Sequence, residues 1–265
     1  MTLPYYRNVS TNYAVAPGGD KLVIGAQSDA LTLIDFKDLR RALTRGSVEH
    51  LSFFDDFFGN AGVAAPQVWK KTAGSTGTAV AEGASGVVGG QWKVTTAATS
   101  SDYVTMALGL HFSATNGALF YDTYVKLAQT TACAVEIGMS DAVSETAGLA
   151  FTDHTVATVT DVATDAAIFA YDSAAGANWM INTVKNGVQQ AYNTGVAAST
   201  SAFVKLSYVI QTNGTIQFYV NDHLITTLTN AITPTVLLTP WNSIVATAAV
   251  AKSFYVDYVG ILSSR

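Results

Sequence analysis

Short runs of apolar and β-branched residues, separated by turn residues, follow one another from Leu51 to the end of the chain. Apolar and polar positions alternate in 203–209 and 217–221, which predicts strands with one buried face and one wet or partnered face. The aromatic runs 51–59 and 252–262 open and close this region, so we expect its two ends to pair in one sheet. The expected strands are 52–58, 67–72, 90–97, 102–110, 118–128, 132–139, 147–152, 165–172, 178–185, 188–193, 202–211, 215–221, 223–229, 235–239 and 252–262.

Turn residues support this strand pattern. The Asn-Gly pairs at 186–187 and 213–214 predict hairpin turns, because these residues accept positive φ at both central positions. Asn221-Asp222 predicts a further tight turn, whereas 73–90 and 153–164 are typical of loops. More than a dozen antiparallel strands without helices indicate an all-β sandwich or jelly roll.

Residues 1–50 form a separate piece that the sandwich of residues 51–265 does not need. Residues 21–26 and 30–35 predict a hairpin, and 36–45 predict a helix, with apolar residues three and four positions apart and a glycine after it. Because this piece cannot bury its own apolar stripe, we expect an arm that docks on the main domain, a neighbouring copy or another protein. The candidate docking residues are Tyr5, Tyr6, Arg7, Tyr13, Phe36, Leu39, Arg40 and Arg41.

The amino-acid composition limits the kinds of partner that this chain is expected to bind. Charged residues make up 12% of the chain, about half of the usual ~25%. Such a surface suits a protein packed against copies or partners, and genome composition is an equally good explanation. The net charge of −5 and the few adjacent basic pairs argue against a nucleic-acid partner. Cys133 lies in an apolar strand and is expected in the core, which fits assembly in a reducing cytoplasm. We expect neither a signal peptide nor a membrane span.

Three motifs carry a resemblance to a known family. Phe53-Phe54-Asp55-Asp56-Phe57 opens the domain, 202–222 has a hairpin pattern, and Phe254-Tyr255-Val256-Asp257-Tyr258-Val259 closes it. In this order they resemble the concanavalin A-like lectin/glucanase (laminin-G-like) sandwich, as found in structural proteins of tailed-phage virions. The likeness covers residues 51–263 and departs at His223, where the family has a glycine. It implies an antiparallel β-sandwich and says little about a ligand.

Glucanases of this family carry acidic residues at alternate positions of one strand, which places two carboxyl groups on one face. Here the same-face neighbours of Glu136 are Gly138 and Ser140, and the adjacent Asp55 and Asp56 point to opposite faces. No catalytic residue is therefore predicted, and we expect the chain not to be an enzyme. Four histidines lack metal-ligand spacing and are expected at the surface or in turns. They are His50, His111, His154 and His223.

Two binding possibilities remain open. Trp179 and Trp241 could contact a glycan if they are exposed, with burial as the alternative, whereas Trp69 and Trp92 are expected to be buried. Loop carboxylates could form a calcium site, although solvated carboxylates are the commoner explanation. The candidate calcium ligands are Asp141, Asp153, Asp161 and Asp165.

These observations predict a non-enzymatic structural protein of a phage virion, such as a capsid cement, decoration or head-fibre subunit. Its arm, residues 1–50, would dock on the shell by strand addition or helix docking. The expected partners are the major capsid protein or another virion protein and, from the family resemblance alone, two further copies in a trimer. The protein would be made in the host cytoplasm and located in the virion. The alternatives are a carbohydrate- or receptor-binding module of a tail fibre or adhesin and, least favoured, a hydrolase with an unrecognised site.

Overall fold

The chain divides into two compact units, residues Met1–His50 and Leu51–Arg265. Each unit has its own set of strands, and the second contains the site described below. The computed structural model describes residues 13–15, 21–25, 31–35, 50–55, 69–82, 90–160 and 162–264.

The first unit contains one small sheet. Strands β1 (Tyr13–Val15), β2 (Lys21–Gly25) and β3 (Leu31–Asp35) pair antiparallel in the order β1-β2-β3. The β2–β3 pair is the hairpin that the sequence predicts. The predicted helix at 36–45 lies outside the described residues.

The second unit is all-β, and its described strands pair antiparallel. None of the described segments forms a helix that could cross a membrane. Its strands are β4 (His50–Asp55), β5 (Lys70–Ala73), β6 (Thr78–Glu82), β7 (Gln91–Thr95), β8 (Tyr103–Ala107), β9 (Leu119–Leu127), β10 (Cys133–Ser140), β11 (Phe151–Asp153), β12 (Thr158–Val159), β13 (Asp165–Asp172), β14 (Asn178–Lys185), β15 (Val188–Ala197), β16 (Val204–Ile210), β17 (Ile216–Val220), β18 (His223–Leu228), β19 (Thr239–Ala246) and β20 (Ser253–Ser264).

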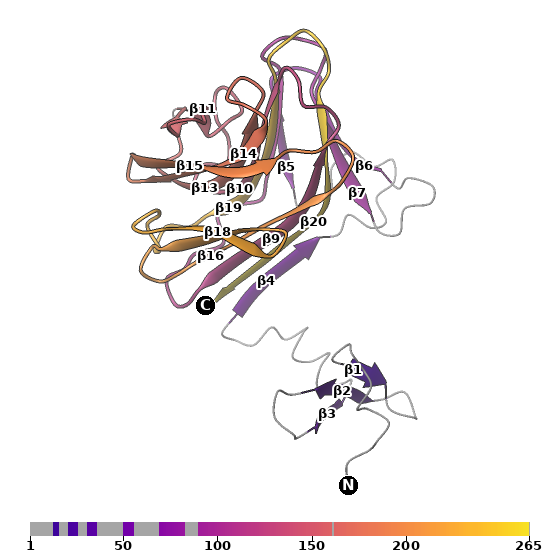
Figure 1. Cartoon of the computed structure of the whole chain (residues 1–265), viewed down its shortest axis with the longest axis vertical. Helices are drawn as coiled ribbons and strands as arrows, with labels where there is room; N and C mark the ends of the chain where they lie inside the picture. Colours follow the sequence, from indigo (N-terminus) through magenta and orange to yellow (C-terminus); the bar gives the residue numbers. More distant parts are fainter. Residues whose placement is uncertain are drawn as a thin grey trace. The chain divides into compact units, whose positions relative to one another are not determined.

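These strands form two facing sheets (Figure 1). The seven-stranded sheet has the order β15-β14-β13-β10-β19-β8-β5. The eight-stranded sheet has the order β18-β17-β16-β9-β20-β7-β6, with β4 paired to β20. The first and last strands of the unit therefore share a sheet, as the aromatic runs predict, and the architecture is the predicted antiparallel sandwich.

The main core lies between the two sheets. Burial alternates along β9 and β16, so every second side chain of these strands points into the core. Tyr121, Tyr208 and Phe218 from the eight-stranded sheet are buried there with Phe169 and Trp179 from the other. The rings of Phe169 and Phe218 meet edge to face with centroids 5.4 Å apart. Burial of each such side chain stabilises the fold by about 1.5–3 kcal/mol.

Two of the three predicted tight turns are confirmed by the backbone. Asn186 and Gly187 join β14 to β15 with φ of 47° and 79°, and Asn221 and Asp222 join β17 to β18 with φ of 50° and 65°. Positive φ at both central positions is the geometry of a two-residue hairpin turn that matches strand twist. The remaining Asn-Gly pair belongs to a longer loop, 211–215, between β16 and β17.

The sequence pattern missed three strands of the second unit, β6, β19 and the two-residue β12 inside the predicted loop 153–164. Strand β19 runs through the middle of the seven-stranded sheet, where only 235–239 is predicted as a strand. Pro240 obscured it, since a proline cannot donate to a sheet ladder. The sheet accommodates this residue because β8 pairs with Trp241–Val245, so Pro240 lies beyond the end of β8. Strand β6, inside the predicted loop 73–90, pairs with β7.

Candidate functional site

Residues 141–164, of which 161 is not described, connect β10 to β13, and we name them the cover segment. The segment contains the β11–β12 hairpin and packs on the outer face of the seven-stranded sheet, away from the main core (Figure 1). Its Ala150 and Phe151 are fully buried in a cluster with Ile168 and Trp241 of the sheet. As a result, every residue of β10 and β19 is buried. In a strand with one face in water, buried and exposed residues would alternate.

Glu136 projects from the central strand β10 onto this covered face, has no exposed surface, and has four polar partners. The main-chain N–H groups of Ala150 and Phe151, in the cover segment, donate to its carboxylate at 2.7 and 2.9 Å. The indole N–H of Trp241 donates at 2.9 Å, and His154 Nε2 lies 3.1 Å from Oε1. A buried carboxylate needs such partners because it has lost its water.

His154 belongs to the cover segment and is only 1% exposed. Its Nε2 faces Glu136, and its Nδ1 lies 3.1 Å from Oδ2 of Asp172. Neutral imidazole can donate from one nitrogen only, so donation to both carboxylates requires the protonated ring. The main-chain oxygen of His154 accepts a hydrogen bond from Asn182 Nδ2 at 2.8 Å, which fixes the position of the ring. We name Glu136, His154 and Asp172 the ionic cluster.

The two carboxylates of the ionic cluster come from neighbouring strands. In the register of β10 and β13, Glu136 is opposite Ala170, and Asp172 is opposite Ala134. Residues two apart on a strand share a face, so both carboxylates project outward from the sheet. The side chain of Asp172 is 16% exposed and also accepts a hydrogen bond from the Ala174 N–H at 2.8 Å, so it forms the rim of the cluster.

Burial and charge act in opposite directions on the His154 ring. Burial alone would lower its pKa, but the hydrogen bonds to Asp172 and Glu136 and the charges of both residues raise the pKa to about 9. The hydrogen bond from His154, which outweighs partial burial, lowers the pKa of Asp172 below its usual value. At neutral pH the cover segment is therefore held by an imidazolium between carboxylates.

A second attachment of the cover segment lies at Gly148. Thr105 Oγ1 on β8 donates to the Gly148 carbonyl oxygen at 2.9 Å, and the hydroxyl of Ser243 on β19 donates to the same oxygen. Gly148 has a φ of +76°, and a Cβ there would lie 2.3 Å from the ring of Tyr103. Only glycine allows the backbone this conformation and this close approach to the sheet.

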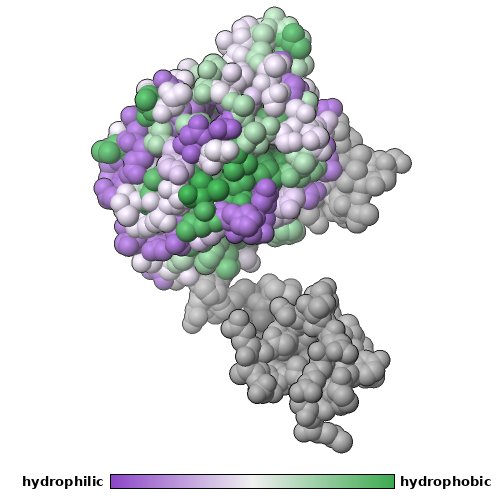
Figure 2. All heavy atoms as spheres, in the orientation of Figure 1, coloured by the Kyte–Doolittle hydropathy of each residue, from purple (hydrophilic) through white to green (hydrophobic). Residues whose placement is uncertain are grey.

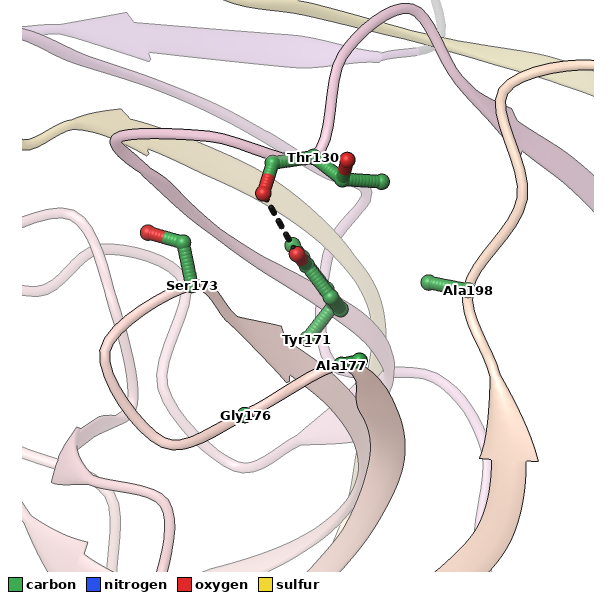
Figure 3. Close-up of a pocket in the computed structure, with 6 residues that line it drawn as sticks. All are labelled: Thr130, Tyr171, Ser173, Gly176, Ala177 and Ala198. Carbon is green, nitrogen blue, oxygen red and sulfur yellow. Dashed lines mark hydrogen bonds between the residues drawn. The ribbon is translucent and has the colours of Figure 1, made fainter.

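One open cavity of about 300 Å³ lies at an end of the sandwich (Figure 3). The hydroxyl of Tyr171 donates to the carbonyl oxygen of Thr130 at 2.7 Å across its wall. Burial raises the pKa of this tyrosine. The lining carries no charged side chain, so it offers no acid or base for catalysis. The lining residues are Thr130, Tyr171, Ser173, Gly176, Ala177 and Ala198.

The outer face of the eight-stranded sheet bears a row of stacked rings, which we name the aromatic row: Phe54, Tyr258, Tyr124 and Phe203. Successive ring centroids are 5.6, 5.8 and 6.3 Å apart. Phe54 is 66% exposed, and the other three rings are partly exposed.

Charged side chains lie beside the aromatic row. Lys205 Nζ is 2.8 Å from Asp222 and 3.5 Å from Asp122, whose Oδ2 accepts a hydrogen bond from the Tyr258 hydroxyl at 3.0 Å. Partial burial raises the pKa of Asp122, with its hydrogen bonds and Lys205 opposing this shift. Burial followed by the charge of Asp122 raises the pKa of Tyr258. Lys205 balances one of the two carboxylate charges.

The structure does not present the predicted glycan contacts to solvent. Trp179 and Trp241 are both fully buried, the first in the main core and the second beneath the cover segment. Trp69 and Trp92 are buried as predicted, and so is Cys133, whose thiol has a pKa raised by burial to about 11.

The other predicted site residues are not brought together. In the described part of the chain, no group of three or more acidic, His or Cys side chains has the arrangement of a metal site. Asp141 binds Thr164, Asp153 binds Thr155 and Asp165 binds Thr233; Asp161 lies outside the described residues. Of the docking residues, Tyr13 begins β1, and the rest lie outside the described residues: Tyr5, Tyr6, Arg7, Phe36, Leu39, Arg40 and Arg41.

The prediction for one histidine was wrong. His111 and His223 are exposed as predicted, and no side chain is described for His50, but His154 is buried at the centre of the ionic cluster. Sequence spacing could not reveal this cluster, because its carboxylates lie on different strands and the imidazole comes from a loop. The only signal was Glu136 itself, a single acidic residue within an apolar strand.

Comparisons with known proteins establish the fold. No family model and no curated protein matches the chain. A protein of unknown function from Shewanella oneidensis MR-1 is 12% identical, with a TM-score of 0.56 over 91% of this chain and 95% of that one. An endo-1,3-beta-glucanase from Streptomyces sioyaensis is 10% identical, with a TM-score of 0.54 over 82% and 97%. The carbohydrate recognition domain of Emp47p is 8% identical, with a TM-score of 0.54 over 83% and 99%. The second unit is thus a concanavalin A-like β-sandwich.

These comparisons correct the predicted function. Further similar structures are LamAcat from Zobellia galactanivorans, a beta-glucanase from Bacillus licheniformis and an endo-beta-1,4-glucuronan lyase from Trichoderma reesei. Several of these proteins are named for action on polysaccharides, and none of those named here is a phage virion protein. The expectations of a non-enzymatic capsid or tail-fibre protein, and of a chain that is not an enzyme, are therefore set aside. The expectation of no enzyme relied on the absence of acidic residues alternating along one strand. The expectation of a virion protein relied on the opening motif, the N-terminal arm and the low charge.

Proposed function

We propose that the second unit is a carbohydrate-active enzyme that hydrolyses a polysaccharide at the outer face of the seven-stranded sheet. The observation that carries this proposal is the ionic cluster, in which Glu136 and Asp172 project from neighbouring central strands toward one imidazole. Glycoside hydrolysis uses such a pair of carboxyl groups, one as the proton donor and one as the base or nucleophile. The shared fold with glucanases supports the same reaction class.

The ionic cluster also indicates which carboxyl group acts as the proton donor and which acts as the base. In the closed state the hydrogen bond from His154 lowers the pKa of Asp172 and so favours its ionised form. When the cover segment leaves, the imidazolium leaves with it, and two like charges remain near each other. One carboxyl group then takes up a proton, because like charges disfavour double ionisation.

The remaining partners decide which carboxyl group is protonated. Asp172 keeps the N–H of Ala174, which favours its ionised form. Glu136 loses the two N–H donors of the cover segment and keeps only the indole N–H of Trp241. Glu136 is therefore assigned as the acid that protonates the leaving glycosidic oxygen. Asp172 is assigned as the base that takes a proton from water, whose oxygen bonds to the anomeric carbon as the glycosidic bond breaks.

The test measures release of reducing ends from soluble β-1,3-glucan and mixed-linkage β-glucan. The wild-type chain should release them, and Asp172→Asn should reduce the rate by about 100-fold or more. The matched control is Asp222→Asn on the opposite sheet, where the side chain is 73% exposed and the rate should not change. Circular dichroism melting shows that each variant is folded.

Two results would overturn the proposal. One is the absence of turnover on both glucans by the wild-type chain and by Gly148→Ala, in which the strained Gly148 attachment loosens the cover segment. The other is turnover by folded Asp172→Asn at the wild-type rate.

A further inference from the structure

We infer that the cover segment is a displaceable gate, and that its removal exposes a glycan-binding surface made by Trp241, Glu136 and Asn182. This inference rests on the proposed function, because it explains how a substrate reaches the ionic cluster. In the closed state Glu136, Asn182 and Trp241 have no exposed surface, so no ligand can contact them.

The two ends of the cover segment meet at one narrow neck. The Asp141 N–H donates to the carbonyl oxygen of Asp165 at 2.9 Å, just beyond the last pair of β10 and β13, Ser140 with Ala166. The Asp141 carboxylate accepts hydrogen bonds from the N–H and hydroxyl of Thr164. A loop that closes on itself at its neck can move without breaking the pairing of the two strands that it joins.

Hydrogen bonds within the cover segment hold it together as one body. The buried carboxylate of Glu145 accepts the N–H groups of Val162 and Ala163 at 2.9 and 2.6 Å. The Thr160 N–H donates to the Ala150 carbonyl oxygen at 2.8 Å, and β11 pairs with β12. These contacts are retained when the segment lifts, so its main chain stays largely satisfied in both states.

The described polar attachments between the segment and the sheet are specific. They include the ionic cluster with its two main-chain donors, the Gly148 carbonyl oxygen, the Asn182 amide and the Ala142 N–H, which donates to Ser140 Oγ. Phe151 and Leu149 supply the main apolar contacts. Local opening of such a unit requires less free energy than global unfolding when it leaves the main core intact. The main core between the sheets is a separate cluster and is not disturbed.

The surface beneath the segment has the composition of a sugar site. Trp241 would offer an indole face, on which the apolar face of a pyranose can stack. The Glu136 carboxylate and the Ser243 and Thr105 hydroxyls would replace the main-chain partners that they now bind with sugar hydroxyls. The cover segment occupies this surface in the way a ligand would.

A test of the gate follows opening and turnover separately on the full chain. Hydrogen exchange of the wild-type chain should show the amides of Ala150 and Phe151 exchanging at least tenfold faster than those inside β10. Gly148→Ala should raise this exchange further, because the added Cβ conflicts with Tyr103. The matched control is Gly176→Ala, which also has a positive φ but no atom within 4 Å of the added Cβ.

A second experiment fixes the cover segment to the sheet with an engineered disulfide. Leu149→Cys with Val245→Cys places thiols on the cover segment and on β19 within one buried cluster, and mass spectrometry verifies the disulfide. The oxidised form should lose at least tenfold in exchange of the segment and in turnover, and dithiothreitol should restore both. Cys133 is buried with a raised pKa, so it stays reduced under mild oxidation.

The outcomes separate the two proposals. The gate is overturned if the amides of Ala150 and Phe151 exchange no faster than those of β10. It is also overturned if the oxidised double-cysteine variant keeps full turnover, and in that case the proposed hydrolase stands. Independent opening of the segment without turnover in any form overturns the hydrolase and leaves the gate.

Discussion

The outer faces of the two sheets carry similar residue types in opposite settings. On the seven-stranded sheet, Glu136 and Asp172 contact His154 of the cover segment, and Glu136 has no exposed surface. On the eight-stranded sheet, Lys205 lies between Asp122 and Asp222, with side chains 24%, 37% and 73% exposed. Figure 2 shows the mixture of polar and apolar residues that the described part of the molecule presents on one side.

The difference shows that burial, and not the number of charges, decides the importance of an ionic group. Loss of one partner leaves an uncompensated charge in the covered cluster, whereas water replaces the lost partner on the open face. The same setting affects the pKa of His154, because in the covered cluster two carboxylates raise it against the effect of burial. The following predictions test this contrast.

The largest effect is expected from Glu136→Ala. The substitution leaves the imidazolium of His154 and the N–H groups of Ala150 and Phe151 buried without their main acceptor. We expect a loss of about 3–5 kcal/mol in the free energy of unfolding, measured by urea denaturation. Asp222→Ala on the open face is the control and should change stability by less than ~1 kcal/mol. Equal effects of the two substitutions would contradict the contrast between the faces.

The pH dependence of stability should follow His154. Its pKa is raised from 6.5 to about 9 in the folded chain, so its stabilisation is fully present below pH 6.5 and is lost as the pH rises toward 9. The shift corresponds to roughly 3 kcal/mol at ~1.36 kcal/mol per unit. Urea denaturation between pH 6 and pH 9.5 should show this decline in the wild-type chain and not in His154→Gln. A wild-type stability that is flat over this range would show that the ring is not held as an imidazolium.

A smaller effect is expected in the aromatic row. Tyr124 lies between Tyr258 and Phe203, with centroids 5.8 and 6.3 Å away. Tyr124→Leu keeps an apolar side chain but removes both ring contacts, and should cost about 0.5–1.5 kcal/mol. Thermal unfolding measures the loss. Tyr255→Leu on β20, the strand next to β9, serves as the comparison. A loss as large as that of Glu136→Ala would mean that this face is not an open surface.

The smallest effect is expected from Lys205→Ala. Its ion pairs with Asp222 and Asp122 are exposed, so we expect a change of only ~0.2–1 kcal/mol. This contribution should disappear in 1 M salt, where screening acts within about 3 Å. Parallel denaturation at 0.05 and 1 M NaCl measures it. A large loss of stability that persists in high salt would mean that these ion pairs behave like those of the buried ionic cluster.

The sequence by itself determined the architecture of the second unit. Strands such as β13 and β14 coincide with their predicted ranges, because alternation and turn residues act between neighbours along the chain. Asn186-Gly187 determined the hairpin between β14 and β15, since the backbone preference of these two residues is local. Even the burial of Cys133 followed from its apolar strand.

Only the tertiary structure decided the site. Glu136, His154 and Asp172 are 18 residues apart in succession, and no spacing rule joins two strands and a loop across that distance. The strand around Trp241 was hidden by Pro240, whose position beyond the end of β8 is set by sheet pairing. A cover segment over an outer sheet face has no pattern of its own, because what buries its residues is the sheet beneath them and not their neighbours in sequence.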